Sequence, residues 1–349
     1  MSDAVQILVQ GLTQGIVYAL LAMGLAVVFR TSRVLNFAHG ETLVVGVFVT
    51  YVLATNPLRP LPYPVAALIG IVVGVGVGLV VYLVAVRGSA AVSGAVLAVM
   101  IAALVARSQG GWVWFLGLGV AAASLVLLRG RLQEGLSGSI RWVLGTIAMA
   151  TLLQEGLVAI IGSTGEAVVV PGPFSGLGTL HVFGVVLPGD QLATAACALI
   201  LVIALDLLES RTRYGRAMKA VAYNPDAAAL MGIDVQRVIY GAFGLAAAVA
   251  VVAGLLITPL VSPKPTDGPM YTVVALVAAL VGGIDRVRSA ALGGIVLGVT
   301  EVLLREGLSD IAGGRLLPLR DAFVYVILIV VLLVLPRGIF GTRKVERAT

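Results

Sequence analysis

The sequence predicts an all-α polytopic membrane protein, and two observations lead to this fold class. Of its 349 residues, 60% are apolar and only 11% are charged, and the mean hydropathy is +1.09, a composition far outside that of soluble globular domains. The apolar residues also fall into runs, several of them long enough to cross about 30 Å of hydrocarbon as helices. Because lipid offers no hydrogen-bond partner to open backbone groups, such runs must be helical. We therefore treat residues 1–349 as a single transmembrane domain.

Charge clusters and Gly/Pro turns divide the chain into about eleven apolar segments. In order, they are 5–29, 41–54, 64–86, 92–106, 112–128, 142–161, 191–208, 238–261, 271–284, 289–304 and 318–335. The segments 41–54 and 271–284 are too short for a comfortable full span. Each is therefore expected to be a broken or re-entrant helix, which needs protein or a water-filled cavity to cover its exposed backbone.

The distribution of basic residues predicts the orientation of these segments. If sides alternate and the loop near residue 211 is cytoplasmic, all but six of the 23 basic residues fall on the inside. The six outside are Arg59, Arg107, Lys264, Arg305, Arg315 and Arg320. The positive-inside rule therefore favours an N-terminus outside and a C-terminus inside. The net charge of +6 needs no nucleic acid as its explanation, because the basic excess lies on the face that meets anionic lipid.

The longest external loop covers residues 162–190. Its valine-rich runs at 168–170 and 182–186 are parted by Pro and Gly, which favours a small hairpin or a partly buried flap.

A basic cytoplasmic loop at residues 209–237 separates two apolar segments. Within it Asn224 suits a helix N-cap, Pro225 the first helical position and Gly232 a left-handed C-terminal residue, so a short helix is predicted between them. The small side chains that follow Asp226 give this helix an almost bare surface, which a soluble partner could approach closely. An ordinary loop helix without a partner is the alternative.

Polar residues gather in the run RTSRVLNFAHGE, where one apolar segment ends and the next begins. Asn36, His39 and Glu41 lie close to a flexible glycine, which suits a bend that lines a solvated cavity. Alternatively, Asn36 and His39 merely satisfy backbone groups at a helix end. No metal site is expected, because His39 and Glu41 are only two residues apart and His181 falls on the opposite side in this topology.

Two carboxylates, Glu155 and Glu301, lie inside apolar segments. Ionisable groups are costly in lipid, so both are expected to face the interior of the bundle, paired with a neighbour or lining a path. The glycines of VGGIDR at 281–286, and those at 293, 294 and 298, are spaced for close helix packing.

Three long runs together resemble the permease subunits of branched-chain amino acid ABC transporters. They are GLTQGIVYALLAMGLAVVFRTSRVLNFAHGE at 11–41, YGRAMKAVAYNPDAAALMGI at 214–233 and ALVGGIDRVRSAALGGIVLGVTEVLL at 279–304. The ending LPRGIFG at 335–341 is similar to that family's C-terminal signature. The resemblance covers nearly the whole chain, and its NFAHGE run is highly specific.

This resemblance implies a membrane subunit of a binding-protein-dependent importer in the bacterial cytoplasmic (inner) membrane. Its expected partners are a second permease subunit, homologous or identical, two cytoplasmic ATPase subunits and an extracytoplasmic solute-binding protein. The solute would be a branched-chain amino acid or a related small amino acid or amide. The chain has no Walker A sequence, so ATP would be used by the partner subunits, and this chain is expected to bind no cofactor and to be no enzyme.

The resemblance also implies roles for particular residues. In ABC importer permeases a loop with Glu or Asp, two alanines, three further residues and a glycine docks into the ATPase. The residues that fit this coupling pattern, or lie beside it, are Gly215, Asp226, Ala227, Ala228 and Gly232. The residues expected near the translocation pathway are Asn36, His39, Glu41, Glu155 and Glu301.

The chain departs from the family pattern at two places. About fifty residues, 88–138, are inserted between segments that usually follow one another, and their two apolar runs predict an inserted helical hairpin that preserves the orientation of the rest. The usual Gly-Gly-Ile-Gly is also changed, because Asp285 follows Ile284.

Two other classes of function compete with this interpretation. A secondary transporter or channel for a small polar solute would explain the short helices and buried carboxylates, but it would leave the docking loop unexplained. An intramembrane hydrolase would need a Ser/His pair carried by the apolar segments, whereas Ser175 and His181 lie in an external loop.

Overall fold

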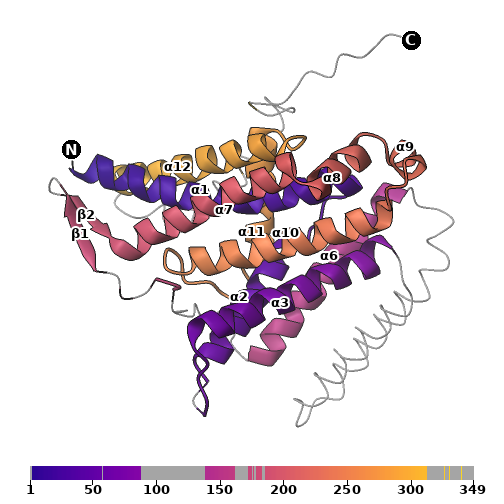
Figure 1. Ribbon diagram of the computed structural model, residues 1–349. Helices are drawn as coiled ribbons and strands as arrows, with labels where there is room; N and C mark the ends of the chain where they lie inside the picture. Colours follow the sequence, from indigo (N-terminus) through magenta and orange to yellow (C-terminus); the bar gives the residue numbers. More distant parts are fainter. Residues whose placement is uncertain are drawn as a thin grey trace.

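The computed structural model describes residues 2–56, 58–87, 138–161, 172–174, 176, 178–182 and 185–312, with three isolated positions at 326, 330 and 339. This part of the chain forms a bundle of helices with a short two-stranded hairpin at one end (Figure 1). The elements are α1 (Ser2–Ser32), α2 (His39–Ala54), α3 (Tyr63–Val81), a π-helical turn η1 (Tyr82–Val86), α6 (Gly138–Ile161), β1 (Thr179–Val182), β2 (Val185–Pro188), α7 (Gly189–Arg211), α8 (Arg213–Tyr223), α9 (Pro225–Leu230), α10 (Val235–Ile257), α11 (Gly268–Gly282) and α12 (Val287–Ala312).

Among the described residues, six helices are long and apolar enough to cross a membrane, and they agree with six of the predicted segments. They are α1, α3 with η1, α6, α7, α10 and α12. The prediction of an all-α polytopic membrane protein is thereby confirmed. The predicted segments 92–106 and 112–128, and with them the inserted hairpin, lie outside the described residues, as does 318–335 except at 326 and 330.

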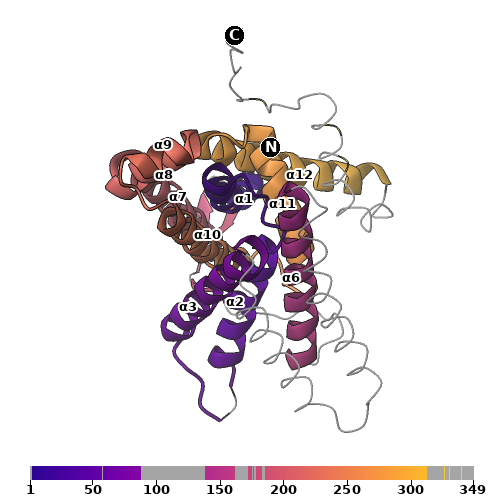
Figure 2. The ribbon, with the colours of Figure 1, turned by 90° about the vertical axis from the view of Figure 1, so that its right-hand side faces the viewer.

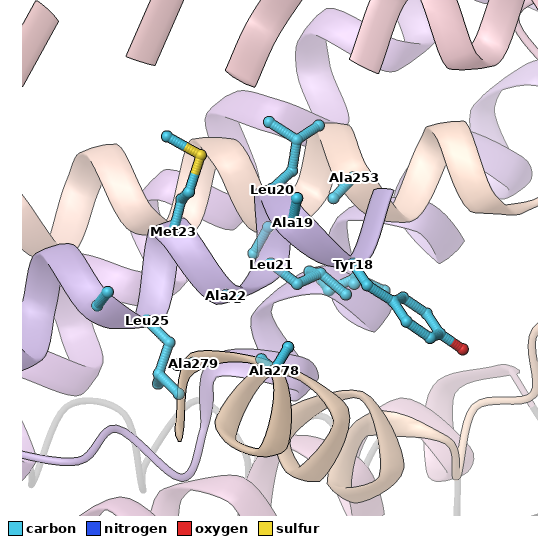
Figure 3. Packing of buried hydrophobic residues seen from close by; sticks show 14 of the residues in the cluster. Tyr18, Ala19, Leu20, Leu21, Ala22, Met23, Leu25, Ala253, Ala278 and Ala279 are labelled. Atoms are coloured by element: carbon cyan, nitrogen blue, oxygen red, sulfur yellow. The ribbon is translucent and has the colours of Figure 1, made fainter. Parts of the chain in front are cut away.

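Helix α1 runs through the centre of the bundle. Its sequence is apolar on all sides, as expected for a helix that is surrounded by others, and residues 17–23 are each at most 2% exposed. Figure 3 shows Met23 and Leu25 leaving α1 on opposite sides, each into the buried cluster that includes residues of α10 and α11.

Glycine lets α1 and α12 approach each other closely. Gly15 lies against the backbone of Ile295, where an added Cβ would come 2.8 Å from the Ile295 carbonyl oxygen. Gly294 and Gly298 face Ala19 and Gly15 in the same way, with backbone in contact with backbone. The predicted use of the 293–298 glycines in helix packing is confirmed.

Outer helices present apolar side chains to the surroundings. Leu68 and Val72 of α3 are each 62% exposed, and Ile200 of α7 is 65% exposed, as expected for residues that face lipid. Helix α6 lies along one edge of the bundle, where Gly145 packs on Ala85 of η1 (Figure 2).

The two short helices predicted at 41–54 and 271–284 correspond to α2 and α11, of 16 and 15 residues. The imidazole Nε2 of His39 lies 3.3 Å from the carbonyl oxygen of Leu21, so α2 begins level with the middle of α1. Since α1 continues to Ser32, the chain returns about 16 Å along α1 before α2 starts. The start of α11 adjoins the start of α2, because the Gly40 N–H donates to Thr272 Oγ1 at 2.8 Å.

The hairpin differs in detail from the expectation. Strands β1 and β2 pair antiparallel, with Val182 opposite Val185, so the second valine run contributes the end of β1 and the start of β2. The run 168–170, which was expected to contribute, lies outside the described residues.

Candidate functional site

Helices α8 and α9 lie at the end of the bundle opposite the β-hairpin (Figure 1). Helix α8 starts where Thr212 Oγ1 accepts the Gly215 N–H at 3.0 Å. An added Cβ at Gly215 would overlap the Glu209 carbonyl, so glycine permits the tight join between α7 and α8. The Tyr214 hydroxyl donates to the Val238 carbonyl at 3.0 Å, and its burial raises the pKa of Tyr214 to about 12. The α8 helix is therefore held against α7 and α10.

Helix α9 has both of the predicted ends. Asn224 Oδ1 accepts the Ala227 N–H at 3.0 Å, with Pro225 at the first helical position. Gly232 has φ +81° and donates to the Ala229 carbonyl, while Ile233 donates to the carbonyl of Ala228. This pair of hydrogen bonds is the Schellman motif, in which glycine adopts the left-handed conformation at lowest cost.

The exposed surface of this helix pair differs from the almost bare one expected. Ala227 is exposed and Ala228 is buried, but three large apolar side chains flank them. Tyr223 is 93% exposed, Leu230 88% and Met231 83%. The sequence carried a signal for this surface, since the large apolar residues Leu230 and Met231 directly follow the alanines of the short helix. Large apolar side chains that stand so far into solvent on a well-capped helix suit a protein partner.

Two ion pairs lie near the end of α7, where the chain enters α8. Glu209, near the end of α7, pairs with Arg30 near the end of α1, and Asp206, one turn earlier, pairs with Arg288 at the start of α12. These contacts were missed at the sequence level, because the paired groups are far apart along the chain.

The predicted polar bend is a tightly packed junction in the described chain, and its three polar residues are buried. Asn36, His39 and Glu41 are 4%, 1% and 0% exposed. Gly40 does not serve as a flexible bend: an added Cβ there would overlap the carbonyl of Gly268, so glycine is required by the close approach of α2 and α11.

Hydrogen bonding distinguishes the three polar residues of this junction. Asn36 Oδ1 accepts the Ala38 N–H at 3.1 Å, and the His39 ring meets the Leu21 carbonyl, so both satisfy backbone groups as in the alternative interpretation. Among the described residues the Glu41 carboxyl oxygens have no hydrogen-bond partner, and they lie against Gly268. Glu41 is thus the chemically distinctive group of the junction.

The two carboxylates inside apolar segments have opposite surroundings. Glu301 is 4% exposed and interacts with Tyr18 of α1, so it faces the bundle interior as expected. Glu155 is exposed on α6, and the expectation that it faces the interior is wrong for the chain alone. The spacing that placed it inside an apolar run could not reveal that α6 lies at an edge.

The chain is similar to known proteins over nearly its whole length. The sequence profile described as branched-chain amino acid transport system / permease component matches residues 7–332. The chain is 28% identical over 341 residues to the high-affinity branched-chain amino acid transport system permease protein LivH of Salmonella typhimurium, covering 97% of this chain and 95% of the relative. It is also 28% identical over 354 residues to BraD of Pseudomonas aeruginosa, a permease protein of the same description, covering 98% and 97%. Among solved structures, PsaBC from Streptococcus pneumoniae in complex with Fab matches with a TM-score of 0.42 at 12% identity, over 94% of this chain and 91% of that chain.

Proposed function

The chain belongs to the family of branched-chain amino acid transport system permease components, and from that premise we propose that it is the membrane-spanning subunit of an ATP-driven importer. Its solute is a branched-chain amino acid or a related small amino acid or amide, which an external binding protein delivers. The related LivH and BraD proteins are described as high-affinity branched-chain amino acid permeases, which supports this solute class.

The observation that carries the proposal is the exposed apolar surface of the α8–α9 pair. Helix α9 is fixed at both ends, at Asn224 and Gly232, and its flanks present Tyr223, Leu230 and Met231 to solvent. In the proposal this surface enters a groove of a cytoplasmic ATPase subunit, with Asp226 and Ala227 at the contact and the buried Ala228 behind them, where it holds α9 against the bundle. A secondary transporter has no use for such a surface.

The orientation follows from the same assignment. With α8 and α9 in the cytoplasm, the N-terminal end of α1 and the β-hairpin lie outside, because they occupy the other end of the bundle (Figure 1). The binding protein then docks at the hairpin end, and two ATPase subunits serve the two permease chains.

A second permease chain completes the pathway. Leu144, Ile147 and Glu155 are exposed along α6, and a carboxylate on a membrane-exposed face is costly unless another protein group or water covers it. In the proposal this face of α6 meets the second permease subunit. Glu155 then lies at the shared path, while Asn36, His39, Glu41 and Glu301 act from behind it by fixing α2, α11 and α12.

The test is retention of the ATPase by single variants at two equally exposed leucines. Leu230 and Leu58 are 88% and 89% exposed, but Leu58 lies between α2 and α3, at the end that the proposal places outside. Replacing a docking leucine by aspartate removes an apolar contact and buries a charge, so Leu230→Asp should lower co-purification of the ATPase and ATP-dependent leucine uptake roughly tenfold or more. Leu58→Asp should retain the ATPase at the wild-type level.

Equal retention of the ATPase by both variants, at equal membrane abundance, would contradict the docking role. Leucine uptake that persists without any ATPase subunit would instead favour a secondary transporter.

A further inference from the structure

Arg33 has a backbone conformation that its side chain does not favour. It follows α1 directly, its N–H donates to the Phe29 carbonyl at 2.8 Å, and its φ is +57°. Among the described residues it is the one non-glycine residue with positive φ. Glycine is the usual residue at such a helix end, because it adopts this conformation without steric cost. The arginine side chain must therefore be accounted for by what it contacts.

The guanidinium of Arg33 joins two elements that the chain keeps far apart. Its Nη2 donates to the carbonyl oxygen of Ala222 at 3.1 Å, and its Nη1 lies 3.7 Å from Asp285 Oδ1. Ala222 belongs to the last turn of α8, where carbonyl groups lack a partner within the helix and a cation is favoured by the helix dipole. The planar guanidinium can serve both contacts at once because its N–H groups point in fixed directions.

The contacts of Arg33 lie beside the parts that the proposed mechanism must connect. Ala222 is two residues from Asn224, the cap of α9. Arg33 itself begins the short connection, 33–38, that carries the chain into the start of α2. Asp285 follows shortly after the end of α11, in the turn where Gly283 has φ +104°.

The other side-chain hydrogen bonds and close contacts of α8 join it to different helices. Tyr214 ties α8 to α10, and Thr212 and Gly215 tie it to α7. Within the described ranges, no other hydrogen bond or ion pair joins α8 or α9 to residues 33–38 or to the turn at 283–286.

We infer that Arg33 is a positioning residue that couples movement of the α8–α9 pair to the two short helices α2 and α11. The inference rests on the proposed function, since it takes the ATPase as the source of that movement. When α8 is displaced, its Ala222 carbonyl carries the guanidinium with it. The guanidinium in turn displaces the backbone leading to α2 and the turn that follows α11. Both ionic groups are about half exposed, 53% each, so the link adds little to folding stability and can break and re-form during a transport cycle.

The experiment compares Arg33→Gly with Arg286→Ala in the assembled importer, with its ATPase and binding protein, in lipid vesicles. Glycine accepts the left-handed backbone, so this variant removes the guanidinium together with the rest of the side chain without adding backbone strain. Arg286 lies in the same turn as Asp285, is exposed, and its side chain makes no hydrogen bond or ion pair among the described residues, so its variant removes an equal charge without the link. Arg33→Asn, which also tolerates positive φ, replaces Arg33→Gly if that variant is absent from the membrane.

We expect Arg33→Gly to assemble normally and to hydrolyse ATP at nearly the wild-type rate, while leucine uptake per ATP hydrolysed falls about fivefold. Arg286→Ala should stay at the wild-type ratio. Asp285→Ala should lower the ratio less than Arg33→Gly, because the hydrogen bond to Ala222 remains. The double variant of Arg33→Gly and Asp285→Ala should have the same uptake per ATP as Arg33→Gly alone, since the two side chains act through one contact.

An unchanged ratio for Arg33→Gly would overturn the inference, as would strictly additive effects of the Arg33 and Asp285 variants. A purely structural role would lower abundance or Tm and leave the ratio of uptake to hydrolysis intact, and that outcome also counts against coupling. Wild-type complexes that hydrolyse ATP but take up neither leucine nor any other branched-chain or related small amino acid or amide would overturn the proposed function, and this inference with it.

Discussion

Glycine is required in this protein for two different reasons. At some positions the backbone has a left-handed conformation, and at others a neighbouring group leaves no room for a Cβ atom. Gly232 has φ +81°, and no atom of the described residues lies within 4 Å of an added Cβ, so its backbone conformation is what requires glycine. Gly268 has an ordinary conformation, but an added Cβ would overlap the carboxyl group of Glu41. These two glycines therefore respond differently to the same kind of substitution.

At Gly232, substitution tests conformation without a change in packing. Gly232→Leu should insert normally, yet lower ATP-dependent uptake roughly fivefold or more. A residue with a Cβ atom costs about 1–2 kcal/mol in the left-handed backbone conformation, and this strain loosens the end of α9. Gly232→Asn should retain more uptake, because asparagine accepts this conformation more readily. Uptake is measured with ATPase retention as the second readout. Wild-type uptake by Gly232→Leu would show that the end of α9 does not matter for docking.

At Gly268, substitution tests packing against the Glu41 carboxyl group, which has no hydrogen-bond partner in the described part of the chain. Gly268→Ala should destabilise the protein by about 1–3 kcal/mol, the usual cost of inserting a methyl group into a tight contact. The double variant with Glu41→Ala should recover part of the lost Tm, because it removes the overlapping group. Thermal unfolding in detergent measures both. If the loss of stability in the double variant equals the sum of the two single losses, the two residues do not contact each other.

At the scale of elements, backbone contact decides how the helices pair. Helices α1 and α12 lie together along Gly15, Gly294 and Gly298, while α2 and α11 meet at Gly40 and Gly268. In lipid there is no hydrophobic force between apolar helices, so small residues that permit close van der Waals contact stabilise such pairs. Helices α1 and α12 are thus in direct backbone contact, and the short helices α2 and α11 begin beside α1.

Two helical glycines provide a matched test of the α1–α12 contact. An alanine Cβ at Gly15 would lie 2.8 Å from the Ile295 carbonyl oxygen, whereas an alanine Cβ at Gly76 of α3 would have no atom of the described chain within 4 Å. Gly15→Ala should therefore lower the Tm and the membrane abundance. Gly76→Ala should be neutral or stabilising by up to about 1 kcal/mol, because alanine favours a helix. Equal Tm values for the two variants would argue against a close α1–α12 contact.

At the scale of the whole molecule, the bundle has two chemically different ends. The α8–α9 pair carries basic and exposed apolar residues, and the opposite end carries the hairpin and the N-terminal end of α1 (Figure 1). The outward orientation of the N-terminus and the inward orientation of the C-terminus remain a prediction from the positive-inside distribution.

Thiol labelling tests this orientation directly. In a Cys197→Ala background, Thr266→Cys should react with an impermeant reagent added outside intact cells, and Arg237→Cys should react only after the inner face is exposed. Thr266 is exposed between α10 and α11, and the Arg237 side chain is 88% exposed at the start of α10. Labelling of both cysteines from one side would refute the alternating topology.

The sequence by itself determined the class of fold, the limits of most helices and the ends of α9. These follow from local chemistry: hydrophobic length predicts a span, and Asn224, Pro225 and Gly232 act on their own backbone. It also placed the two short helices, whose length alone made them unusual.

The tertiary structure decided which polar groups are buried and which are exposed. Glu155 and Glu301 both lie in apolar runs, yet one lies at the edge of the bundle and the other at its centre. Asn36 and His39 bond to backbone where a cavity was expected, and the link from Arg33 to Ala222 and Asp285 joins residues from three distant parts of the chain. Burial and partners depend on which helices come together, and that is settled by packing between elements, which no single stretch of sequence contains.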